Sequence, residues 1–144
     1  MAVALLALAG VALASSARFK PGRYTGKTSQ GKRAVFTISK TAACKYSRNG
    51  PTTQCLTAGN IYLAIKCTDG SSTNDYAVPT DGIPANGHIH IVIHQSQGFI
   101  PGTQVDDVRV HTNGTITGTL SENVTESANG VKCSTGTVKF SAKH

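Results

Sequence analysis

Residues 105–120 read Val-Asp-Asp-Val-Arg-Val-His-Thr-Asn-Gly-Thr-Ile-Thr-Gly-Thr-Leu, and this stretch decides the fold class. In an extended chain, one face of it would carry the apolar residues Val108, Val110, Ile116 and Leu120. The Asn113-Gly114 pair stands between the two alternating runs, and this arrangement is the strongest short-range signal for a β-hairpin. The stretch therefore predicts two antiparallel strands, 105–112 and 115–120, joined by a tight turn.

The same alternation of apolar and polar residues recurs along the chain. It is present in 33–40, 60–67, 88–94 and 137–142. No segment beyond the N-terminal apolar run shows helical spacing. We therefore predict one domain, residues 18–144, folded as an all-β antiparallel β-sandwich of about seven or eight strands, with a small barrel as the alternative. The sandwich is favoured because Cys67 and Cys133 lie on or beside distant strands and could link two sheets.

The first 17 residues are apolar and uncharged, with small residues at Ser15 and Ala17. They are too short to cross a bilayer and match the apolar core of a secretory signal, although a basic n-region is missing. We expect a signal peptide at 1–17 with cleavage after Ala17, which leaves no membrane span and a secreted or cell-envelope protein. An uncleaved anchor is the alternative.

Export makes the four cysteines informative, because an even number is expected to pair in an oxidising compartment. Of the three connectivities, Cys44–Cys55 and Cys67–Cys133 are favoured. Cys44 and Cys55 flank a turn-rich stretch, Ser47-Arg-Asn-Gly-Pro51, which would bring them together. A zinc site on cysteines is disfavoured because the chain contains no Cys-x-x-Cys pair.

Charge is distributed unevenly along a chain whose formal net charge is +7. Residues 18–68 contain ten Lys and Arg and no acids, whereas residues 69–144 contain four Lys and Arg and seven acids. A basic surface of this kind could attract anionic polysaccharide or a cell-envelope polymer, and the candidate contacts are Arg23, Lys27, Lys32 and Arg33. No basic and aromatic interleaving of the nucleic-acid-binding type is present. The alternative interpretation is that the charge only keeps a secreted protein soluble.

The stretch His-Ile-His-Ile-Val-Ile-His at 88–94 predicts a strand with histidines on one face and isoleucines in the core. His88 and His90 would lie roughly 7 Å apart, and His94 roughly 13 Å beyond His90. If this strand pairs with 105–112, the two registers that bury both apolar sets and align the histidines place His111 opposite His88 or His90. A His88, His90 and His111 site would suit zinc or copper. A solvated strand face that is sensitive to pH is the alternative.

The sequence contains no motif that indicates a particular catalytic activity: the nucleophile elbow, the P-loop and the dinucleotide-binding fingerprint are all missing. Asp106 and Asp107 are adjacent on a predicted strand, so they would point to opposite faces and would not form a simple acid–base pair. We therefore expect an exported non-catalytic binding or structural module without a cofactor. A metal-binding protein or metalloenzyme that uses the His-x-His strand is the alternative.

Three motifs carry a resemblance to known proteins: Gly22-Arg-Tyr-Thr-Gly-Lys-Thr28, Cys67-Thr-Asp-Gly70 and the ending Cys133-Ser-Thr-Gly-Thr-Val-Lys-Phe-Ser-Ala142. In these motifs the chain resembles a group of small exported actinobacterial proteins of unknown function. The resemblance spans most of the chain after Ala17. It implies a β-sandwich with a bridge of the Cys67–Cys133 type, and it implies no catalytic residue.

Overall fold

The computed structural model describes residues 18–39, 44, 47, 54–95, 101–126 and 129–144. Its ten strands are β1 (Gly22–Thr28), β2 (Arg33–Ile38), β3 (Cys55–Cys67), β4 (Ser72–Ala77), β5 (Asp81–Gly82), β6 (His88–Gln95), β7 (Gly102–His111), β8 (Thr115–Thr125), β9 (Lys132–Ser134) and β10 (Val138–Lys143). The predicted signal peptide at 1–17 lies outside the described residues. Within the described part of the chain, no helix has the length and apolar character needed to span a membrane.

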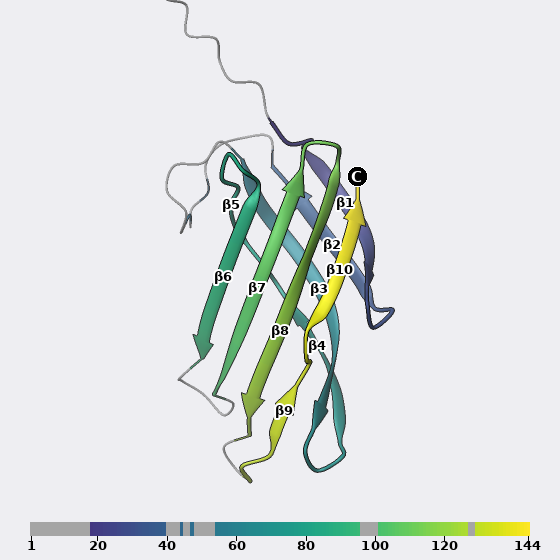
Figure 1. The fold of residues 1–144 in the computed structure, drawn as a ribbon, viewed down its shortest axis with the longest axis vertical. Helices are drawn as coiled ribbons and strands as arrows, with labels where there is room; N and C mark the ends of the chain where they lie inside the picture. The colour runs from purple at the N-terminus through teal and green to yellow at the C-terminus, as the bar shows by residue number, and fades with distance from the viewer. Residues whose placement is uncertain (1–17, 40–43, 45–46, 48–53, 96–100, 127–128) are drawn as a thin grey trace, which may run out of the picture.

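All strand pairings are antiparallel, and the strand order is β10-β1-β2-β3-β9-β8-β7-β6. β10 also pairs with β8, so β10, β1, β2, β3, β9 and β8 close into a ring. β6 and β7 extend this ring beyond β8, whereas β4 and β5 pair with β3. Figure 1 shows the resulting two layers, with β6, β7, β8 and β10 in front of β1, β2 and β3.

The prediction of an all-β antiparallel fold is confirmed, but a sandwich of two separate sheets is not the observed arrangement. The six-stranded ring is a barrel, because β10 hydrogen-bonds to β1 on one side and to β8 on the other. Glycines allow this closure. A Cβ at Gly26 would collide with the Ser141 carbonyl of β10, and a Cβ at Gly118 would collide first with the Asp107 carbonyl of β7 and then with the Phe140 ring of β10.

The core follows the predicted alternation. The inward-facing positions of the expected strands are buried: Ala34, Phe36, Ile38, Ile61, Leu63, Ile65, Ile89, Ile91, Val108, Val110, Ile116, Leu120, Val138, Phe140 and Ala142. Ile93 packs against this cluster and is partly buried. The Asn113-Gly114 turn between β7 and β8 is present, and Gly114 adopts the positive φ of 84° that the turn needs. The β-hairpin predicted from residues 105–120 is therefore confirmed.

Both predicted disulfides are present, Cys44–Cys55 and Cys67–Cys133. Cys67 of β3 lies directly opposite Cys133 of β9, so this bridge joins neighbouring strands of the barrel. The expected link between two sheets was wrong because β9 inserts into the sheet between β3 and β8. The predicted turn between Cys44 and Cys55 lies largely outside the described residues.

Candidate functional site

A basic face covers the outer surface of β10, β1 and β2. Alternation turns the side chains of Tyr24 and Thr28 inward and leaves the basic residues outward. The exposed basic residues of these strands are Arg23, Lys27, Arg33, Lys139 and Lys143. We refer to these five residues as the basic face. The three strands contain no Asp or Glu.

Strand register brings the members of the basic face together. Lys27 lies opposite Arg33 on β2 and opposite Ser141 on β10. Lys143 lies opposite Thr25, the outward residue between Arg23 and Lys27. Among the described residues, no member of the basic face forms an ion pair with a carboxylate. The positive charge of the basic face is therefore exposed to solvent and available to an anionic ligand.

Three of the four predicted polyanion contacts, Arg23, Lys27 and Arg33, lie on this face. Lys32 is half-buried in the turn between β1 and β2, where its backbone N–H donates to Thr28 Oγ1 over 3.2 Å. Sequence reasoning missed Lys139 and Lys143, because they lie more than a hundred residues beyond the other members. The outward alternation of 138–143 was the signal that could have identified them.

The histidine strand pairs in a register that differs from both predicted ones. His88 lies opposite Arg109 and His90 opposite Asp107. The ladder continues to Gln95 opposite Gly102, so β7 begins three residues before the expected 105. The predicted registers were wrong because the strand was expected to begin at 105. Gly-Thr-Gln at 102–104 has little apolar character, so the sequence pattern did not indicate that these residues also pair with β6.

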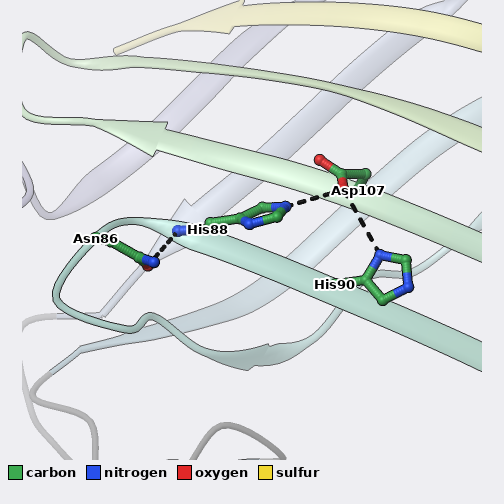
Figure 2. A network of polar contacts seen from close by, with 4 residues as sticks. All are labelled: Asn86, His88, His90 and Asp107. Carbon is green, nitrogen blue, oxygen red and sulfur yellow. Dashed lines mark hydrogen bonds and ion pairs between the residues drawn. The ribbon is translucent and has the colours of Figure 1, made fainter.

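Asp107 lies between two imidazoles on the outer face of the sheet (Figure 2). Its Oδ2 is 2.9 Å from His88 Nε2 and 3.6 Å from His90 Nδ1. Partial burial acts to raise the pKa of Asp107, but the hydrogen bond and charge of His88, and then those of His90, lower the pKa below its ordinary value. The strand entering this cluster is held by Asn86, whose Oδ1 accepts from the His88 backbone N–H over 3.0 Å.

The other two histidines of this face have partners of their own. His111 Nε2 lies 2.9 Å from Thr117 Oγ1 on β8, which is the side of β7 away from β6. His94 Nδ1 lies 3.3 Å from Thr103 Oγ1. In the described part of the chain, no three His, Cys, Asp or Glu side chains are close enough to hold a metal ion. The structure thus places His88 and His90 together, with Asp107 where the prediction had placed His111.

Asp106 and Asp107 point to opposite faces of β7, as predicted. Asp106 is fully buried and accepts a hydrogen bond from Gln104 Nε2 over 2.7 Å, whereas Asp107 lies on the histidine face. The two carboxyl groups are separated by the sheet and do not form an acid–base pair.

Comparison of the chain with protein-family models, with curated proteins and with solved structures found no match.

Proposed function

We propose that this protein is an exported, non-catalytic binding module that adheres to anionic polymers through the basic face. One observation carries the proposal: five exposed basic side chains from three adjacent strands share one surface that has no carboxylate on those strands. The two disulfides support an oxidising compartment, as expected for a secreted or cell-envelope protein.

The geometry of a strand surface suits a linear polyanion. Neighbouring strands lie about 4.8 Å apart and alternate residues about 6.7 Å apart, so the long Lys and Arg side chains can reach successive anionic groups. Such contacts are electrostatic and not tied to one sequence of sugars. We therefore assign the partner to the class of anionic polysaccharides or envelope polymers.

Retention on a heparin resin tests the proposal. Reversing two charges on the basic face, in Arg23→Glu with Lys27→Glu, should lower the salt concentration needed for elution. The matched control is Lys66→Glu with Lys132→Glu, because both lysines are exposed on β3 and β9 and the net charge changes equally. A second pair, Lys139→Glu with Lys143→Glu, should weaken retention as strongly as the first. Equal elution of all three variants would remove the proposal, since net charge alone would then explain retention.

Metal binding on the histidine strand is the second candidate function, and it rests on the two imidazoles of His88 and His90, which both face Asp107 on one surface. Imidazoles suit zinc or copper, but no three His, Cys, Asp or Glu side chains of the described residues are close enough to hold an ion, so a further ligand from outside this group would be needed. Metal analysis of the purified protein tests it. A stoichiometric metal content that is lost in His88→Ala would support this function, and a melting temperature unaffected by chelator in a metal-free protein would exclude it.

A further inference from the structure

A cavity of about 200 Å³ lies between the two layers beside the Cys67–Cys133 disulfide. Its polar wall comes from three strands and the turn before one of them: Ser71 before β4, Thr73 and Asp75 on β4, Gln95 on β6 and Glu122 on β8. Glu126, just beyond β8, also lines it. The apolar wall consists of Ile65, Val124 and the disulfide itself.

The cavity is acidic although the protein is basic. Three of the seven acids in the chain, Asp75, Glu122 and Glu126, line it, and no Lys, Arg or His among the described residues does. Burial, followed by the negative charges of Asp75 and of Asp106 on the neighbouring β7, raises the pKa of Glu122. The cavity therefore carries negative charge, in contrast to the basic face on the outside of β10, β1 and β2.

Glu122 differs from the other two cavity acids in having no partner. Its side chain is 7% exposed, and in the described part of the structure its carboxylate accepts no hydrogen bond and forms no ion pair. Only its backbone is bonded, since its N–H donates to Thr135 Oγ1 and its carbonyl accepts from the Thr135 N–H. By contrast, Asp75 accepts from the Tyr76 N–H over 2.7 Å and Glu126 from Asn129 Nδ2 over 2.9 Å. The Glu122 carboxylate therefore faces the cavity with its hydrogen-bonding capacity available to solvent or to a bound ligand.

We propose that this cavity binds a small organic cation, with an ammonium group on Glu122 and a short alkyl chain against Ile65, Val124 and the disulfide. An ammonium group has three donors, which match the carboxylate of Glu122 and the oxygens of Thr73 and Gln95. A single metal ion fits less well, because no three carboxyl, imidazole or thiol groups of the described residues converge. The volume is below the roughly 300–1,000 Å³ of sites for drug-sized ligands, so the ligand, or the part of it that enters, has only a few heavy atoms.

Titration of the full chain with n-butylamine, followed by NMR chemical shifts, tests this assignment. We expect saturable shifts of the Thr73, Gln95 and Val124 amides with n-butylamine, and much smaller shifts with 1-butanol or butyrate at the same concentration. Equal shifts with 1-butanol would overturn the proposal, because the alkyl chain alone would then explain binding. Calcium ions producing the same shifts at lower concentration would overturn the assignment to an organic cation.

Two variants with the same change in charge locate the site. Glu122→Gln should weaken n-butylamine binding by about tenfold or more, since a charge-assisted hydrogen bond is lost. Asp107→Asn should bind as the parent does, because Asp107 lies on the outer face beside His88 and does not line the cavity. Equal affinities of the two variants would show that Glu122 does not hold the cation. Heparin retention is expected to be the same in both, so this result is separate from the test of the basic face.

Discussion

At the scale of single residues, Glu122 is held in the folded chain at a cost to stability. Its pKa is raised in the folded protein, so the folded state binds the proton more tightly than the unfolded state does. Stability from this group is fully present below the unfolded pKa of about 4.3 and is lost as pH rises through the folded pKa. A residue retained at such a cost is consistent with a binding role.

Replacing Glu122 by Gln should therefore stabilise the protein at neutral pH. We expect a gain of about 1 kcal/mol in the free energy of unfolding, or about 4 °C in melting temperature, because a buried carboxylate is no longer ionised. Urea denaturation at pH 4 and pH 7 measures it. The gain should be larger at pH 7, and a variant less stable than the parent at pH 7 would contradict this account.

Asp107 has the opposite linkage. Its pKa is lowered by His88 and His90 against the effect of burial, so its contribution to stability is present above the unfolded pKa of about 3.9. That contribution is lost as pH falls through the lower folded pKa. Asp107→Asn should lower stability at pH 5 by at most about 1 kcal/mol, since the pair is partly exposed to solvent. Denaturation curves that differ as much at pH 2 as at pH 5 would argue against the ion pair as the cause.

At the scale of elements, β10 decides whether the sheet closes. It lies between β1 and β8, and its close approach to β1 requires glycine at the inward position Gly26, while Gly118 on β8 leaves room for the Phe140 ring and for the β7 backbone. Phe140 on β10 packs its ring 5.4 Å from that of Phe36 on β2, so the closing strand also fills the barrel. The same strand therefore closes the barrel through its backbone and fills the core through its side chains.

Gly26→Ala should destabilise the protein by about 3 kcal/mol. The added Cβ would collide with the Ser141 carbonyl, and a backbone atom cannot move aside without breaking the β1–β10 ladder. Thr25→Ala is the matched control, because its side chain is exposed on the same strand and should change stability by less than about 0.5 kcal/mol. Thermal unfolding compares the two, and an equal loss in both would show that β10 does not constrain Gly26.

At the scale of the whole molecule, charge of opposite sign is separated in space. The basic face occupies the outside of β10, β1 and β2, whereas three acids line the cavity between the layers. Binding of a polyanion to the basic face should release counterions, so affinity should fall as salt rises. Replacing Arg23 and Lys27 by Glu should flatten the slope of log Kd against log salt concentration for heparin. An unchanged slope would indicate that these residues do not contact the polymer.

Strand existence and core positions could be predicted because each depends on local alternation. Ile89 and Ile91, for example, are buried only because every second residue of a strand faces the core. The sequence did not predict β4, because its residues Ser72–Tyr76 are all exposed and only Ala77 is buried. The strand therefore lacks the alternation of apolar and polar residues that identified the others. An edge strand of this kind is defined by its hydrogen bonds to β3 and not by its composition.

The sequence by itself determined the antiparallel β-class, the faces of the main strands and the basic character of residues 18–68. These features depend on period-two patterning, turn chemistry and composition, all of which are local. Only the tertiary structure decided the barrel closure, the position of Asp107 between His88 and His90, the addition of Lys139 and Lys143 to the basic face, and the acidic cavity around Glu122. Each of these depends on which strands become neighbours and in what register, and that is set by packing between residues far apart in the chain.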